Sequence, residues 1–221
     1  MCDEMTESDF YAKGKSYWET IPATIDGMLG GHSSVLNADI RASSRFLEDF
    51  LEDKKQPVGK ERALDCGSGI GRVTKHLLAK FFTTVDMVEQ NKEFLDASHV
   101  YLDQENKRVC KRFNYGLQDF IPDEKHYDVI WCQWVTGHLT DDDFVSFLKR
   151  CKNGLKDNGI IVIKDNLSSG EIDTDHEDGS VTRPRELLVS LFKRANLTLL
   201  AERKQYKFPK GLYQVKMFAL R

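Results

Sequence analysis

The 221-residue sequence predicts an α/β fold with a mostly parallel sheet and helices on both faces. Two observations carry this prediction. From residue 62 onward, short apolar stretches typical of strands alternate with longer stretches of helical periodicity, as in parallel βαβ units. The chain then ends in two strand-like stretches with no helix between them. This ending indicates an antiparallel terminal hairpin at one edge of the sheet.

Each element follows from its own stretch of sequence. Strands are expected at 63–66, 84–89, 109–115, 127–134, 159–166, 197–206 and 212–220, and helices at 72–80, 91–105, 140–153 and 184–195. Two earlier helices are expected at 8–19 and 41–53, separated by the Gly-rich stretch DGMLGG. We therefore expect a single domain, in which an N-terminal helical extension (1–58) precedes a core at 59–221.

Composition narrows the function classes. Lys and Arg total 32 against 35 for Asp and Glu, and the resulting charge of −3 argues against a direct nucleic-acid partner. No apolar run approaches the roughly 20 residues that a membrane-spanning helix needs, so no membrane partner is expected. The cysteines at positions 2, 66, 110, 132 and 151 are odd in number and form no CxxC motif. Such cysteines are typical of reduced thiols, so we expect a cytoplasmic and nuclear protein.

A glycine-rich loop follows the first strand of the alternating region. The stretch LDCGSGIGR places Gly67, Gly69 and Gly71 between a strand and a helix, where glycines let the backbone turn tightly and approach a ligand. The spacing GxGxG disfavours a dinucleotide pyrophosphate site. Glu89 ends the second strand about 20 residues later, where a carboxylate can accept both ribose hydroxyls. A tight turn with an unrelated glutamate is the alternative interpretation.

Over about residues 60–221 the chain resembles the class I S-adenosylmethionine-dependent methyltransferases. The resemblance rests on LDCGSGIGR, VDMVE and YDVIWCQWV. It implies a Rossmann-like, seven-stranded sheet with a reversed last strand, S-adenosyl-L-methionine as cofactor and S-adenosyl-L-homocysteine as product. It also implies the cofactor-binding residues Gly67, Gly69, Arg72, Glu89, Gln90, Asn91, Leu117, Gln118 and Gln133. Arg72 suits the methionine carboxylate because a guanidinium forms charge-assisted pairs, although an exposed arginine at a helix start is the plainer interpretation.

Three features bear on the substrate. Trp18 and Trp134 are aromatic planes outside the obvious core pattern, and His138 follows the end of a strand, where α/β proteins bind ligands. The stretch EIDTDHED at 171–178 holds five carboxylates. It lacks the glycine and final glutamate of a calcium loop, so no metal is expected. Core packing, a structural histidine and a solvated loop are the plainer interpretations, whereas an acidic loop beside a methyl donor suits a cationic substrate.

These residues also carry a closer resemblance, to the alpha-N-terminal protein methyltransferases. It spans nearly the whole chain and rests mainly on IPATIDGMLGG and QWVTGHLTD. It implies mono-, di- or trimethylation of the free α-amine of protein N-termini beginning Xaa-Pro-Lys, after removal of the initiator Met, with the extension covering the active site. It implies Asp178, His138 and Asn166 as catalytic residues and Trp18, Tyr17, Leu29, Trp134, Asp175 and Ser180 as substrate-binding residues.

One departure and two alternatives accompany this resemblance. Glu89 stands where the family is expected to have Asp, so the ribose geometry is expected to differ. A methyltransferase for a small cationic amine metabolite would need only the cofactor motif and an acidic pocket. A non-catalytic, cofactor-binding regulatory subunit would have a degraded site. The presence of Asn166, Asp178, His138 and Trp134 argues against the regulatory subunit.

Overall fold

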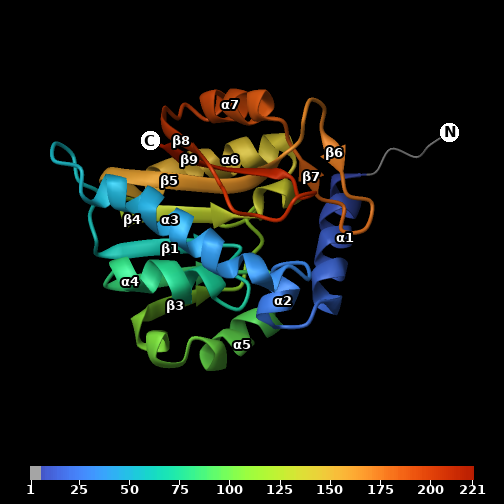
Figure 1. Cartoon of the computed structure of the whole chain (residues 1–221), viewed down its shortest axis with the longest axis horizontal. Helices are drawn as coiled ribbons and strands as arrows, with labels where there is room; N and C mark the ends of the chain where they lie inside the picture. Colours follow the sequence, from blue (N-terminus) through green and yellow to red (C-terminus); the bar gives the residue numbers. More distant parts are fainter. Residues whose placement is uncertain (1–5) are drawn as a thin grey trace.

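The computed structural model describes residues 6–221, which build a seven-stranded sheet (Figure 1). The strands are β1 (Arg62–Cys66), β2 (Thr84–Val88), β3 (Val109–Phe113), β4 (Tyr127–Gln133), β5 (Leu155–Leu167), β8 (Leu199–Lys204) and β9 (Gln214–Leu220), in the order β3-β2-β1-β4-β5-β9-β8. The first five are parallel, and β9 is antiparallel to both of its neighbours. The predicted fold class is confirmed. The reversed strand lies inside the sheet, and β8 forms the edge.

Helices cover both faces of the sheet because the central strands carry apolar side chains on both faces. On β4, Ile130 and Cys132 join a core with α6 (Asp141–Gly154) and α7 (Arg185–Arg194). Val129 and Trp131 face the other way, toward α3 (Leu36–Leu51) and the π-helical turn η2 (Thr74–Leu78). The same side carries α4 (Ala79–Phe81) and α5 (Lys92–Tyr101), and the short helices η3 (Asp103–Arg108) and η4 (Thr136–His138) lie in connections.

Several element boundaries differ from the sequence prediction by a few residues, and two of these differences have clear local reasons. Helix α3 begins five residues before the expected position 41. The prediction missed these residues because the first turns bury the polar side chains of Asp39 and Ser43, which interrupt the apolar periodicity. Strand β5 begins at Leu155 instead of 159, because Leu155 pairs with Tyr127 before the register shifts. Asn158, with a φ of 64°, lies within this irregular stretch.

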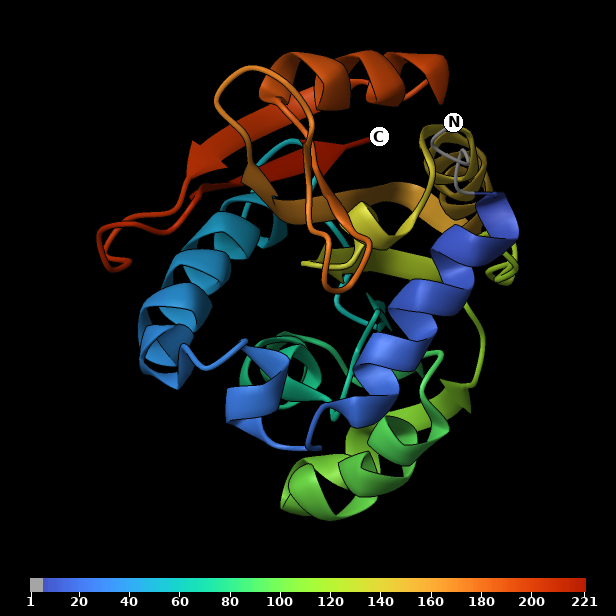
Figure 2. The same cartoon turned by 90° about the vertical axis from the view of Figure 1, so that its right-hand side faces the viewer.

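The N-terminal segment crosses the end of the sheet where the parallel strands finish. It comprises α1 (Glu7–Thr20), α2 (Ile25–Met28) and η1 (Ser33–Val35) and leads into α3, whose Phe46 and Leu47 are part of the core. Residues 1–5 of the expected extension lie outside the described residues. The acidic stretch forms a short hairpin of β6 (Asp173–Thr174) and β7 (Val181–Thr182), which we call the acidic hairpin (171–182). Figure 2 shows α1 passing beside this hairpin.

Within residues 6–221, no helix is both long enough and apolar enough to span a bilayer.

Candidate active site

A cavity opens beyond the carboxyl ends of β1, β2 and β4, around the glycine loop. Gly67 and Gly69 have φ values of 67° and 54°, which favour glycine. An added Cβ at Gly67 would come within 2.4 Å of the Val135 side chain, and one at Gly69 within 2.4 Å of the Met28 sulfur. The loop can approach these side chains so closely only because Gly67 and Gly69 carry no Cβ. The empty space, which opens to solvent, is about 1000 Å³. We call it the glycine-loop cavity.

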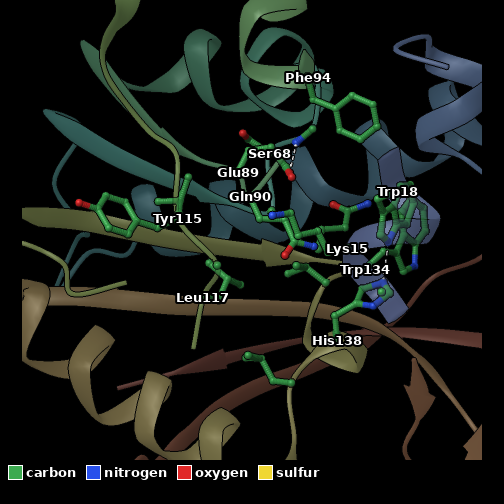
Figure 3. A pocket seen from close by; sticks show the side chains of 18 of the residues that line it. Lys15, Trp18, Ser68, Glu89, Gln90, Phe94, Tyr115, Leu117, Trp134 and His138 are labelled. Carbon is green, nitrogen blue, oxygen red and sulfur yellow. Dashed lines mark hydrogen bonds between the residues drawn. The ribbon is translucent and has the colours of Figure 1, made fainter. Parts of the chain in front are cut away.

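Glu89 fastens this loop to the end of β2. One carboxylate oxygen accepts the Gly69 N–H at 2.9 Å, and the other accepts the Asn91 N–H at 2.8 Å. Burial raises the pKa of Glu89, and these backbone donors oppose the rise. Glu89 and Gln90 line the cavity (Figure 3). The predicted residue Asn91 is not among the lining residues. Its side chain accepts from the Glu93 N–H and donates to the Trp18 carbonyl.

Arg72 and Gln133 line the cavity and share one partner that sequence reasoning missed. Arg72 is buried, not exposed at a helix start, and its Nη1 donates to the Asp39 carboxylate at 2.5 Å. Gln133 donates to both carboxylate oxygens of Asp39, at 2.9 and 3.0 Å. The Arg72 guanidinium also lies over the Trp134 ring, 5.2 Å from its centroid. An acidic residue in line with the apolar residues of α3 was the signal that could have identified Asp39.

Leu117, Gln118 and Tyr115 line the far end of the glycine-loop cavity, with Tyr115 and Leu117 opposite the two tryptophans in Figure 3. Two buried polar atoms along the cavity, Ser68 Oγ and Trp134 Nε1, have no hydrogen-bond partner within residues 6–221. Buried polar groups are normally paired, so these two atoms indicate a polar ligand. The glycine cradle, the buried Glu89 and these two atoms fit an adenosine-containing cofactor.

A second cavity adjoins the first and reaches to the acidic hairpin. Trp18, Met28, Trp134 and His138 line both cavities. The second cavity also brings together the predicted residues Leu29, Asn166, Asp175, Asp178 and Ser180. We call it the acidic cavity. Tyr17 is not among the lining residues of either one. It packs edge-on against Trp18, at 5.5 Å between ring centroids.

Trp134 adopts an unusual backbone conformation at the junction of the two cavities. It follows β4 directly, with a φ of 53°, which bulky residues rarely adopt. Its N–H donates to the Lys164 carbonyl at 3.0 Å, so pairing with β5 holds the strained residue. Such strain is concentrated at functional sites.

His138 lies at the same junction as a neutral hydrogen-bond acceptor. Trp18 Nε1 donates to His138 Nε2 at 3.0 Å, so the ring proton is on Nδ1. Burial lowers the pKa of His138, while Asp178 and Asp175 oppose this effect. Asp178 Oδ2 is 3.7 Å from His138 Nε2, and its Oδ1 accepts the Ser180 N–H at 2.7 Å. The imidazole and the carboxylate thus face the same space, where the carboxylate can accept a proton directly and the imidazole Nε2 already accepts from Trp18.

The acid sensitivity of the fold is expected to depend on His138. Because its pKa is lower in the folded state, the unfolded chain takes up the proton first as the pH falls below about 6.5. The free energy of unfolding is therefore expected to decline between pH 7 and 5 more steeply in the wild type than in His138→Gln, whose amide can still accept from Trp18. Urea denaturation across this range measures the difference. Parallel curves for the two proteins would contradict the assignment.

Another carboxyl that the sequence did not reveal, Asp165, lines the acidic cavity. Burial raises its pKa to about 6, and the Thr136 hydroxyl donates to it. Arg183 holds the adjoining turn by donating to the carbonyls of Thr136 and Leu139, at 2.9 and 2.6 Å. Within the described part of the chain, no cluster of three or more His, Cys, Asp or Glu side chains could hold a metal ion.

A glycine loop after β1, an acidic residue directly after β2 and a seven-stranded sheet with a reversed strand define a class I S-adenosylmethionine-dependent methyltransferase. The family of AdoMet-dependent proline di-methyltransferases matches residues 6–221, and the chain belongs to this family. It is 51% identical to an N-terminal Xaa-Pro-Lys N-methyltransferase 1-B from Xenopus laevis and 49% identical to an N-terminal Xaa-Pro-Lys N-methyltransferase 1 from Mus musculus. Each alignment covers 97% of this chain and 96% of the relative.

Two solved structures share this fold. A SAM-dependent methyltransferase from Leishmania major is 37% identical, with a TM-score of 0.90 over 97% of this chain and 84% of that chain. A phosphoethanolamine N-methyltransferase from Haemonchus contortus is similar in fold, with a TM-score of 0.71 at 16% identity over 98% of this chain and 50% of that chain.

Proposed function

We propose that this protein transfers methyl groups from S-adenosylmethionine to the free α-amine of protein N-termini beginning Xaa-Pro-Lys. The observation that carries the proposal is the junction of the two cavities, where Trp18, Trp134 and His138 separate a glycine-loop cavity from an acidic one. The names of the relatives that are about half identical over nearly the full chain support it. A methyl donor on one side and a cationic peptide end on the other would meet at this junction.

On the cofactor side, the bound S-adenosylmethionine would supply an electrophilic methyl group. Glu89 would take the ribose hydroxyls, because each of its oxygens accepts one backbone N–H and keeps a free lone pair. Arg72 would pair with the methionine carboxylate, and Leu117 with Gln118 would frame the adenine. The remaining predicted contacts are Gly67 and Gly69 at the loop, Gln90 beside the ribose, and Gln133 at the end of β4. Asn91 would contribute by holding Glu89 and Trp18 in place.

On the substrate side, the acidic cavity would receive the first three residues of the peptide. Asn166 would hydrogen-bond the first residue, and Trp134 with Trp18 would pack around the proline ring. Asp175 and Ser180 would receive the lysine. Leu29 would help to close the channel, and Tyr17 would act from behind by packing on Trp18. A free N-terminus and a proline ring fit this arrangement, whereas an internal lysine would be rejected.

Proton removal would be the task of Asp178 and His138. An α-amine has a pKa of about 7.7–8.0, and only its neutral form is nucleophilic. The carboxylate and the neutral imidazole lie 3.7 Å apart and face one space. The Asp178 carboxylate can accept the proton directly, whereas His138 Nε2 would accept it once the Trp18 N–H releases that nitrogen. The amine nitrogen would form the new bond to the methyl carbon as the carbon–sulfur bond breaks. Much of the acceleration would come from holding the two reactants in line.

The N-terminal extension (1–58) would cover the active site, as part of a single domain with the core at 59–221. Its helix α1 supports this role, because Phe10, Tyr11, Gly14, Lys15 and Trp18 line the glycine-loop cavity. An added Cβ at Gly14 would lie 3.3 Å from His138 Nδ1, so the helix packs closely on the catalytic pair. Location in the cytoplasm and nucleus stays a prediction of the sequence.

Mass spectrometry of short peptides incubated with S-adenosylmethionine tests the proposal. We expect methylation of a Ser-Pro-Lys peptide and little of a Ser-Ala-Lys peptide, because alanine cannot fill the space between the tryptophans. Equal turnover of small free amines would favour a metabolite methyltransferase. Cofactor binding without turnover of any amine would favour a regulatory subunit.

A further inference from the structure

We propose that Asp39, from α3 of the N-terminal extension, is a positioning residue that fixes Arg72 for the carboxylate of the cofactor. The inference rests on the proposed function, since it takes Arg72 as the group that receives this carboxylate. The extension would then complete the cofactor site from beneath as well as cover it. Asp39 is not among the residues that line either cavity, so it acts through its neighbours.

Asp39 is fully buried and is surrounded by donors. One carboxylate oxygen accepts from Arg72 Nη1 and from Gln133 Nε2, and the other accepts from Gln133 Nε2 and Lys164 Nζ. Two of its three side-chain partners, Arg72 and Gln133, line the glycine-loop cavity. Asp39 therefore connects two cavity-lining side chains through one rigid group.

Lys164 keeps this carboxylate ionised. It is a fully buried residue of β5, and its Nζ also donates to Ser43 Oγ at 2.9 Å and to Gln205 Oε1 at 2.8 Å. Burial alone would raise the pKa of Asp39, but the charges of Lys164 and Arg72 hold it below its usual value. A buried carboxylate between two cations is stable only where such partners compensate its lost hydration.

A partner that fixes Arg72 before the cofactor binds would strengthen cofactor binding. An arginine side chain has many rotamers, and restricting them only on binding lowers the affinity for the ligand. Asp39 accepts from the Nη1 of Arg72, and the Cζ of Arg72 lies over the Trp134 ring, 5.2 Å from the centroid. A second buried carboxyl near Arg72, Asp65, is already occupied, because its Oδ2 accepts the N–H and hydroxyl of Thr74, at 3.0 and 2.6 Å. Asp39 is thus the carboxylate that bonds Arg72.

Comparison of two ligands tests this inference by calorimetry, without turnover. S-adenosylhomocysteine carries the amino-acid group, whereas 5′-methylthioadenosine has the same adenosine and thioether without it. In Asp39→Asn we expect the Kd of S-adenosylhomocysteine to rise about tenfold or more, and that of 5′-methylthioadenosine to change less than about twofold.

Asp86→Asn is the matched control. Asp86 is also fully buried and ion-paired, with Arg62 at 2.9 Å, but it is not among the residues lining either cavity. This variant is expected to shift both ligands equally or not at all. A selective loss of S-adenosylhomocysteine in Asp86→Asn as well would overturn the inference, because loss of any buried ion pair would then produce it.

Loss of Asp39 alone leaves Lys164 buried without its carboxylate, so folding is checked by circular dichroism. The double variant Asp39→Asn/Lys164→Met removes both charges and is expected to keep the fold and show the same selective loss. Unchanged binding of S-adenosylhomocysteine by a folded variant, or an equal loss of both ligands, would overturn the inference. Arg72→Gln separates the two proposals. If it leaves S-adenosylhomocysteine binding intact, the proposed role of Arg72 fails. If it weakens binding while Asp39→Asn does not, only the inference about Asp39 fails.

Discussion

Asp178→Asn is expected to lower the turnover of a Ser-Pro-Lys peptide by about two orders of magnitude. The amide keeps the shape of the side chain and can still accept the Ser180 N–H, but it cannot take a proton from the α-amine. The Kd of S-adenosylhomocysteine is expected to change little, because Asp178 lines only the acidic cavity. Steady-state kinetics and calorimetry on the same preparation measure both quantities.

The control for this variant is Glu177→Gln, which removes one negative charge from the neighbouring position of the acidic hairpin. Glu177 is exposed and is not among the residues that line the two cavities. Its variant is expected to retain turnover close to that of the wild type. Equal losses in both variants would mean that the charge of the hairpin matters and that Asp178 has no specific role in proton removal.

Glu89→Gln is expected to raise the Kd of S-adenosylhomocysteine by at least about tenfold. Both carboxylate oxygens accept backbone N–H groups, so the amide nitrogen of glutamine would face a donor on one side. The same change removes the acceptor for the ribose hydroxyls. Calorimetry is expected to show a similar loss for 5′-methylthioadenosine, which also contains the ribose, in contrast to Asp39→Asn.

Glu93→Gln provides the comparison for Glu89. Glu93 is an exposed residue in the first turn of α5, only four positions further along the chain. Its substitution is expected to leave both ligands unaffected. If Glu89→Gln binds S-adenosylhomocysteine as tightly as the wild type, the ribose is held elsewhere and the assignment of Glu89 is wrong.

Local patterns of sequence predicted most of the fold. Apolar alternation and turn residues are short-range features, so the strands and the terminal hairpin could be located before the structure was known. The acidic stretch was expected as a loop, yet Asp173–Thr174 and Val181–Thr182 pair as a short hairpin. The hairpin also contacts α1, where Lys13 Nζ donates to the His176 carbonyl at 2.7 Å, and sequence periodicity does not encode a contact between such distant segments.

The candidate site was harder to predict from the sequence, because its buried charged residues pair with partners that are far away in the chain. Asp39 meets Lys164 across 125 positions, and neither has a local motif. Lys164 lies in the apolar run of β5, where a buried lysine is unexpected without knowledge of its partner. Tyr17 and Asn91 were placed in the site by resemblance. Adjacency in the sequence to a cavity-lining residue does not determine which way a side chain points. In the structure, both Tyr17 and Asn91 contact Trp18 instead of lining a cavity.

The location of the methyl group within one peptide tests the central claim most directly. A peptide beginning Ser-Pro-Lys offers two amines, the α-amine and the lysine side chain, and tandem mass spectrometry after incubation with S-adenosylmethionine distinguishes them. We predict that the methyl groups lie on the α-amine and that the acetylated peptide stays unmodified. Methyl groups on the lysine side chain, or modification of the acetylated peptide, would contradict the account.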